Sequence, residues 1–273
     1  MTTEQIVLGI AIGVAAGILS GLFGVGGGVV TTPAIQELLG GAPYIAVGTP
    51  LPVAIPSAVV GGYTYARARE VSWRAVRFAA IPGIAGAAAG AWMTSSIDPH
   101  WLLLVTAGLI AWQAVRIGRS STYRVRPRGS TPGWQYTALG GFTGLVSGLL
   151  GVGGGIVFVP LVTTMLGMPL KRALGTSLVF IAIIAVPGTI VHAALGHIDW
   201  GIAFVLMLGV IPGARIGASI ALGTRERTLR LLVGSFLLVV AVVYAVAEVA
   251  RLAAEHDGFP LPAQPISVER TLR

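Results

Sequence analysis

A glycine-rich phrase that occurs twice is the part of this sequence whose residue types and spacing can do chemistry. The first copy covers residues 17–33 and the second residues 144–160, and every glycine of the first copy has a counterpart 127 positions later. Consecutive glycines disfavour a helix, because each costs about 1 kcal/mol relative to alanine. Both copies lie inside long apolar stretches, so each predicts an apolar segment that is interrupted at its middle.

The chemistry predicted for these interruptions is anion binding by backbone amides. A short helix is expected to restart at about Val29 and at about Ile156, and the first amides of a helix lack intrahelical partners and carry partial positive charge. Irregular backbone at membrane depth must be buried or line a cavity, and paired interruptions point to a transporter site. The predicted substrate-binding glycines are Gly24, Gly26, Gly27 and Gly28 in the first copy and Gly151, Gly153, Gly154 and Gly155 in the second. The alternative is that the glycines only permit close helix packing.

Hydroxyl groups begin the apolar segment that follows each phrase. Thr49 follows Gly48, and Thr176 and Ser177 follow Gly175. These three residues are candidate neutral donors to the anion. The alternative is that they bond carbonyls of their own helix, and the sequence favours neither. Ser20 and Ser147, one helical turn before the loops, are open to the same two interpretations.

Two further polar residues lie within predicted spans. Arg215 is a lone charged side chain well inside an apolar segment, where a charge costs about 2.5–3.5 kcal/mol and usually has a function. We predict contact with the substrate, with snorkelling or a structural bond to carbonyls as the alternative. His192 lies one turn from the end of its segment, and a proton-relay role is a hypothesis for it.

The composition is that of a membrane protein: 55% of residues are hydrophobic and only 10% are charged. The net charge of +8 comes from short arginine clusters between apolar segments, which indicates topology and not nucleic-acid binding. The chain has no cysteine, which excludes disulfides, thiolate metal sites and cysteine nucleophiles, and we expect no cofactor. The amino end lacks a basic leader, so no cleavable signal is predicted.

The duplication extends beyond the glycine phrases and divides the chain into two halves. Residues 46–51 match residues 173–178, and residues 71–73 match residues 198–200. The predicted halves are 1–118 and 134–253, joined by a cytoplasmic linker at 119–133 and followed by a polar tail at 254–273.

The charge distribution predicts an all-α membrane protein built from two inverted-topology repeats. Lysines and arginines form four basic clusters, at residues 67–77, 116–128, 171–172 and 225–230. All four lie on the cytoplasmic side only if each glycine phrase is the tip of a broken, re-entrant helical hairpin that enters and leaves on one side. Three transmembrane helices then follow each hairpin, and both termini lie outside. The predicted elements are a hairpin at 6–40 with spans at about 45–66, 78–97 and 100–117, and a hairpin at 134–170 with spans at about 173–196, 200–223 and 230–249.

The repeated Gly-Val-Gly-Gly-Gly phrase, the proline five residues on (Pro33 or Pro160) and the later Gly-Thr pair together resemble the TauE/SafE family of sulfite and organosulfonate exporters. The resemblance covers about residues 5–250. It implies movement of sulfite, sulfonates or related small anions across a bacterial membrane, commonly outward. One departure is the series Pro50, Pro52 and Pro56, which is expected to break or kink its span.

The function predicted from these observations is secondary transport of a small sulfur-containing anion, outward across the cytoplasmic membrane. Another small oxyanion or a carboxylate is the alternative cargo. An intramembrane enzyme is disfavoured, because no predicted span contains an aspartate or glutamate and no nucleophile–base pair has a recognisable spacing. The expected partners are the small anion and the lipid bilayer, with no nucleic acid. A homodimer is left open.

Overall fold

The computed structural model describes residues 3–39, 42–94, 108, 131–151, 153–236, 238–239 and 242. All regular secondary structure in these ranges is helical. The helices are α1 (Thr3–Phe23), α2 (Gly28–Glu37), α3 (Pro43–Gly48), α4 (Pro50–Arg67), α5 (Trp73–Thr94), α7 (Gly133–Leu150), α8 (Gly155–Thr164), α9 (Leu170–Ala194) and α10 (Trp200–Gly223), and residues 226–236 are also helical.

Five helices in the described part of the chain are long and apolar enough to cross a membrane. A helix needs roughly 20 apolar residues for this, since it rises about 1.5 Å per residue. The five are α1, the segment Tyr44–Arg67 that joins α3 to α4, α5, α9 and α10. The prediction of an all-helical protein is therefore confirmed for the described residues, and the five candidate spans agree with a multi-pass membrane protein.

Both glycine phrases break their helices, as predicted, but the two arms of each hairpin differ in length. The first arms, α1 and α7, have 21 and 18 residues, whereas the second arms, α2 and α8, have 10 residues each. A second arm of this length covers about 15 Å, roughly half of the hydrocarbon core. Each hairpin thus combines a long first helix with a short helix that starts in the interior.

Several predicted boundaries need correction. The span expected at 45–66 corresponds to the candidate span Tyr44–Arg67. It is interrupted at Thr49, as its prolines predicted, because Pro50 and Pro52 lack the amide that continues the helix ladder. The second hairpin ends at Thr164 and not at residue 170, and α9 begins at Leu170. Helix α5 begins at Trp73, before the predicted 78. The span predicted at 100–117 and the tail lie outside the described residues apart from Gly108, as does half of 230–249. Only residues 131–133 of the predicted linker are described.

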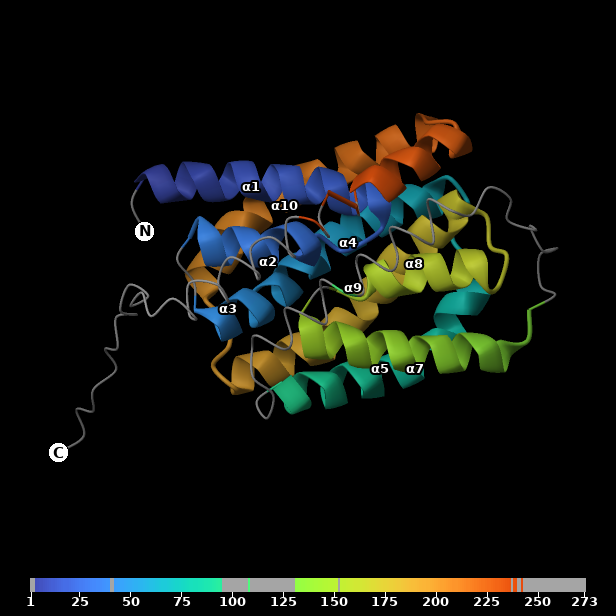
Figure 1. Ribbon diagram of the computed structural model, residues 1–273, viewed down its shortest axis with the longest axis horizontal. Coiled ribbons are helices and arrows are strands. Elements are labelled where there is room, and N and C mark those ends of the chain that lie inside the picture. Colours follow the sequence, from blue (N-terminus) through green and yellow to red (C-terminus); the bar gives the residue numbers. More distant parts are fainter. Residues whose placement is uncertain are drawn as a thin grey trace.

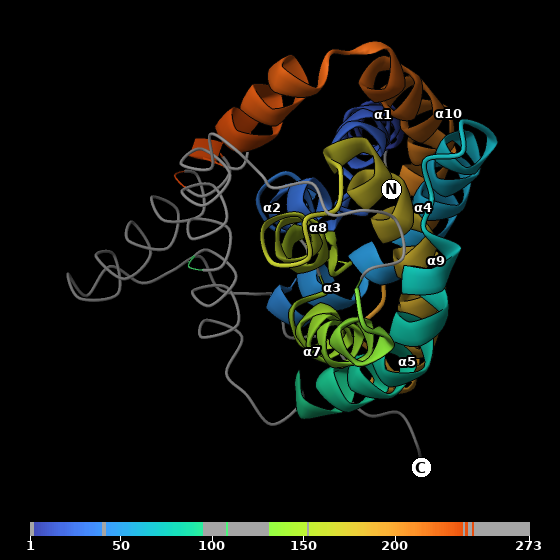
Figure 2. The ribbon, with the colours of Figure 1, turned by 90° about the vertical axis from the view of Figure 1, so that its right-hand side faces the viewer.

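The short helices α2 and α8 lie at the centre of the molecule. In Figure 2 the longer helices α1, α10, α4, α9, α5 and α7 form an arc around them. Helix α1 runs along one edge of the molecule and α7 along the opposite edge, in opposite directions (Figure 1). This arrangement places both glycine loops inside the protein, where irregular backbone is protected from lipid.

The first arm of each hairpin packs side by side with a helix of the other half. Gly9 and Gly17 of α1 face Val205 and Val210 of α10, so the two helices run parallel. Helices α7 and α5 form the equivalent pair, in which Gly141 faces Pro82 and Gly148 faces Ala87. Small residues along these seams let the helix backbones approach closely, which is the usual basis of helix association in membranes.

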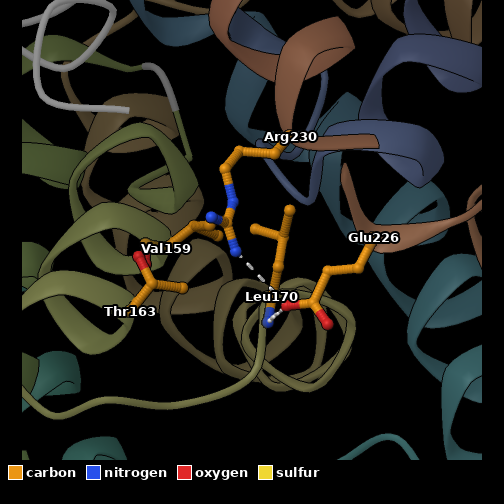
Figure 3. Close-up of polar contacts among 5 residues, drawn as sticks. All are labelled: Val159, Thr163, Leu170, Glu226 and Arg230. Carbon is orange, nitrogen blue, oxygen red and sulfur yellow. Dashed lines mark hydrogen bonds and ion pairs between the residues drawn. The ribbon is translucent and has the colours of Figure 1, made fainter. Parts of the chain in front are cut away.

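The basic clusters of the described residues gather at one end of the helices. Lys171 Nζ, at the start of α9, donates a 2.6 Å hydrogen bond to the carbonyl of Leu222, near the end of α10. The Leu170 amide donates to Glu226, whose carboxylate lies 3.8 Å from Arg230 (Figure 3). The Ser72 amide, between α4 and α5, donates to Thr176 of α9. These contacts bring the clusters at 67–77, 171–172 and 225–230 together.

Candidate anion-binding site

The two glycine loops have the same backbone conformation. Gly24, Gly26 and Gly27 have positive φ angles, as do their counterparts Gly151, Gly153 and Gly154, and this conformation favours glycine over every other residue. Gly27 (φ 83°) and Gly154 (φ 74°) directly precede α2 and α8, and neither helix start has a side-chain cap. Gly28 and Gly155 are the first residues of these helices. Gly24 and Gly151 instead follow the last residues of α1 and α7, so the eight predicted glycines form the buried connection from each first arm to its short helix.

The two loops touch each other. A Cβ atom built on Gly153 would lie 3.6 Å from the Cα atom of Gly26 and 3.3 Å from the carbonyl oxygen of Val25. Gly155 lies directly against the Gly24 carbonyl. The N-termini of α2 and α8 consequently meet, and each contributes about half a positive charge from its dipole. The described conformation is closed between the loops, so a ligand between them requires the loops to separate.

Each loop also packs on the long helical segment of the other half. Gly24 lies against Leu174, whose Cα would be 3.0 Å from a Cβ on the glycine, and Gly151 lies against Val47, the counterpart of Leu174. The Ser177 hydroxyl donates a 2.8 Å hydrogen bond to the carbonyl of Gly24. Ser177 therefore contacts a loop, but its one hydroxyl hydrogen is directed to this carbonyl, whereas the prediction directed it to the anion. Its counterpart is Pro50, which has no hydroxyl, so this contact exists in one half only.

The other two predicted hydroxyls have a different role. The hydroxyl of Thr49 accepts a 3.0 Å hydrogen bond from the amide of Asp199, and that of Thr176 accepts a 2.9 Å bond from the amide of Ser72. Asp199 and Ser72 are equivalent residues, each just before a long helix, so the two threonines fix the turns that precede α10 and α5. The prediction grouped both threonines with the loops. The structure instead shows that Thr49 and Thr176 are fully buried and that each accepts a hydrogen bond from a backbone amide of the opposite half.

Arg215 is not brought to the loops. It is exposed on α10, whereas its neighbours Gly213 and Ala214 are buried. That buried side faces α1, since Gly17 lies against Ala214. The sequence placed Arg215 correctly within a span, but only the packing of α10 determines which face it occupies. Its position is compatible with snorkelling of the long side chain.

His192, which is buried, forms a pair with the half-buried His197. The two Nδ1 atoms are 3.2 Å apart, and His192 Nε2 donates a 3.0 Å hydrogen bond to the carbonyl of Gly148 on α7. His197, in the turn after α9, stacks on Tyr44. Burial lowers the pKa of His197 below its usual value of 6.5. His192 thus reaches the last turn of the helix that precedes the second glycine loop.

The sequence analysis missed two residues beside the loops. Ser57 donates a 2.8 Å hydrogen bond to Ser20, which fixes α4 on α1 one turn before the first loop. Thr143 lies beside Gly154, together with Ser147. The available signal was the spacing of Thr143 and Ser147, four residues apart on one face of a helix. No comparable signal marks Ser57, because its partner is distant in the sequence.

The surroundings of the loops are neutral. The nearest neighbours of the loop glycines belong to glycine, alanine, valine, leucine, isoleucine, serine and threonine residues. Such a site offers partial positive charge from two helix starts and hydroxyl donors, without a basic side chain. Its chemistry suits a small anion that hydrogen bonds can hold.

Comparison with known proteins agrees with this geometry. Residues 9–244 match the family model described as "Sulfite exporter TauE/SafE". A "Probable membrane transporter protein" of Xylella fastidiosa (strain 9a5c) is 28% identical over 81% of this chain and 87% of its own length. "Probable membrane transporter protein YunE" of Bacillus subtilis (strain 168) is 25% identical over 76% and 85%, respectively.

A third relative, "Probable inner membrane transporter protein TsaS" of Comamonas testosteroni, is 28% identical over 63% of this chain and 68% of its own length. No solved structure matches the chain significantly. The family match spans most of the chain and includes both glycine loops. The chain therefore belongs to the sulfite exporter TauE/SafE family and is a membrane transporter, not an enzyme.

Proposed function

We propose that this transporter moves a small sulfur-containing anion, sulfite or an organosulfonate, outward across the cytoplasmic membrane. The observation that carries the proposal is the meeting of two helix N-termini, each after a glycine loop, in a neutral interior. Together their dipoles supply about one positive charge, which matches a small anion. The family description names sulfite as cargo and export as direction.

We further propose that the two halves are inverted repeats, with both termini outside. Three observations support this. Helices α1 and α7 run in opposite directions (Figure 1), the first arm of each hairpin packs on the other half, and the described basic clusters share one end of the helices. Positive residues favour the cytoplasmic side, so that end faces the cytoplasm in this proposal.

Alternating access between such repeats accounts for the closed contact at Gly26 and Gly153. If one half rocks against the other, the two loops separate on one side of the membrane at a time. The anion then binds to the helix starts while the loops are apart. Expelling one negative charge across an inside-negative membrane gains about 2.3 kcal/mol per 100 mV, so outward movement of the anion alone is favourable.

Uptake of radiolabelled sulfite into everted membrane vesicles tests the proposal. Vesicles that contain the chain should accumulate sulfite faster than vesicles without it, and unlabelled methanesulfonate should compete. Acetate in the same assay tests the second candidate cargo, a small carboxylate. Equal sulfite uptake with and without the chain would refute the proposed cargo.

A further inference from the structure

The two halves differ at the start of their short helices. Thr143 and Ser147 of α7 both border Gly154, because a Cβ built on this glycine would lie 3.1 Å from Thr143 Cγ2 and 3.1 Å from Ser147 Cβ. Both side chains are buried, with 0% and 1% of their surface exposed. Neither hydroxyl has a hydrogen-bond partner among the described residues.

At the equivalent place in the first half, the hydroxyl already has a hydrogen-bond partner. Thr143 and Ser147 correspond to Ala16 and Ser20, which border Gly27 at a looser 3.7 Å. There the Ser20 hydroxyl is occupied by its bond with Ser57. The counterpart of Ser57 is Ile184, which offers no polar atom to Ser147. Two buried residues whose hydroxyls have no partner among the described residues therefore border one helix start, whereas Ala16 and the bonded Ser20 border the other.

A buried hydroxyl without a partner is costly, so native proteins rarely retain one without a reason. The backbone beside these hydroxyls also has donors to offer. The amides of Val157 and Phe158 donate to the Gly154 carbonyl. The amides of Gly155 and Ile156, which come first in α8, have no acceptor within their own helix. Two residues with unpartnered hydroxyls and two such amides thus lie next to Gly154.

We propose that the side-chain contacts to the transported anion come from the second half alone. The hydroxyls of Thr143 and Ser147 and the first amides of α8 bind a singly charged oxyanion, and the first loop supplies only opposing backbone. This inference rests on the proposed transport function. It assigns the side chains of the site to one helix start, while the dipoles of both short helices act on the anion, and it limits the anion to one charge state.

The charge of the bound anion can be inferred from the side chains that are buried in the protein. The buried side chains with polar atoms among the described residues are serines, threonines, Tyr65, Tyr136 and His192, and no aspartate, glutamate, lysine or arginine is among them. Two helix starts offset about one negative charge. Because the cost of removing an ion from water rises with the square of its charge, a second negative charge has no compensation. The site therefore suits a sulfonate or hydrogen sulfite, and not sulfate or the sulfite dianion.

The duplication provides a matched control for the test. The double variant Thr143→Val/Ser147→Ala removes both unpartnered hydroxyls with little change of shape. The control Ser20→Ala/Ser57→Ala removes a hydroxyl pair at the equivalent place of the first half. Binding of radiolabelled sulfite is measured for each in lipid nanodiscs, with the single variants Thr143→Val and Ser147→Ala in parallel.

We expect sulfite affinity to fall about tenfold or more in the Thr143/Ser147 variant and to stay within about twofold in the control. Without sulfite, the thermal unfolding midpoint of the Thr143/Ser147 variant should not fall, because no hydrogen bond is lost. A structural role would lower that midpoint instead. Wild-type affinity in this variant would show that the hydroxyls hold water only, which overturns the inference while the proposed function stands.

Competition tests the charge state separately. Methanesulfonate, which carries one charge at any physiological pH, should displace sulfite, and sulfate should not. Sulfite binding should weaken as the pH rises and hydrogen sulfite loses its proton. Equal competition by sulfate would overturn the single-charge part of the inference. Absence of any sulfite or sulfonate binding to the wild type would instead refute the proposed function.

Discussion

Tyr65 and His192 occupy equivalent positions, 127 residues apart, and make the same contact in the two halves. The Tyr65 hydroxyl donates a 3.1 Å hydrogen bond to the carbonyl of Gly21, and His192 Nε2 donates a 3.0 Å bond to the carbonyl of Gly148. Gly21 and Gly148 are also equivalent, each in the last turns of a hairpin's first arm. Each contact therefore ties a first arm to the long helix of its own half, just before a glycine loop.

This relationship predicts a loss of stability when the tyrosine hydroxyl is removed. Tyr65→Phe should destabilise the protein by about 1 kcal/mol, because a buried hydrogen bond disappears while the ring remains packed. Tyr63→Phe is the control, since Tyr63 is 63% exposed. Thermal unfolding in detergent compares the two variants. Equal midpoints would mean that the Tyr65 contact contributes nothing to stability.

His197 predicts a dependence of stability on pH. Burial lowers the pKa of His197, so the unfolded chain binds the proton more readily than the folded one. Stability is therefore retained above the usual pKa of about 6.5 and falls as the pH drops below it toward the lowered folded value. His197→Gln should reduce this fall relative to wild type. Parallel pH profiles of the unfolding midpoint for the two proteins would argue against the prediction.

Alanine at the two residues that precede the short helices tests how tightly each loop is held. Alanine at a left-handed position costs about 1–2 kcal/mol, and this applies to Gly27 and Gly154 alike. The surroundings differ, because a Cβ on Gly154 meets atoms at 3.1 Å whereas a Cβ on Gly27 meets none closer than 3.7 Å. Gly154→Ala should therefore reduce sulfite transport and stability more than Gly27→Ala. The reverse order would contradict the described packing.

Most of the fold prediction followed from the duplication and the glycine phrases. Three consecutive glycines disfavour a helix by local backbone chemistry alone, so the break at Gly26–Gly28 could be predicted without knowledge of the tertiary structure. The contacts between the halves did not follow from the sequence. From the sequence, Thr49 is a candidate donor to the ligand. The fold shows instead that Thr49 accepts a hydrogen bond from the amide of Asp199, which is 150 residues away in the sequence. The difference between Ser57 and Ile184 is visible in the sequence, but its meaning depends on knowing that both residues face the helix before a loop.

Arg215 provides a test of the exposed face of α10. Because its side chain lies away from the loops, Arg215→Gln should leave sulfite affinity within about twofold of wild type and should have only a small effect on stability. Equilibrium binding in nanodiscs is the measurement. A tenfold loss of affinity would restore the original prediction that this guanidinium contacts the substrate, and would require a rearrangement of α10 on binding.

Single cysteines test the proposed orientation, since the chain contains none of its own. Ala68 lies in the exposed turn between α4 and α5, at the end that carries the basic clusters, and Leu195 lies in the turn after α9, with 39% of its surface exposed. In the proposed topology Ala68→Cys faces the cytoplasm and Leu195→Cys faces outside, because positive residues stay on the cytoplasmic side. A membrane-impermeant maleimide applied to intact cells should therefore label Leu195→Cys and leave Ala68→Cys unlabelled until the membrane is permeabilised. Transport by both variants confirms that the labelled protein is folded. Labelling of Ala68→Cys in intact cells would reverse the orientation, and labelling of both would mean that α9 does not cross the membrane.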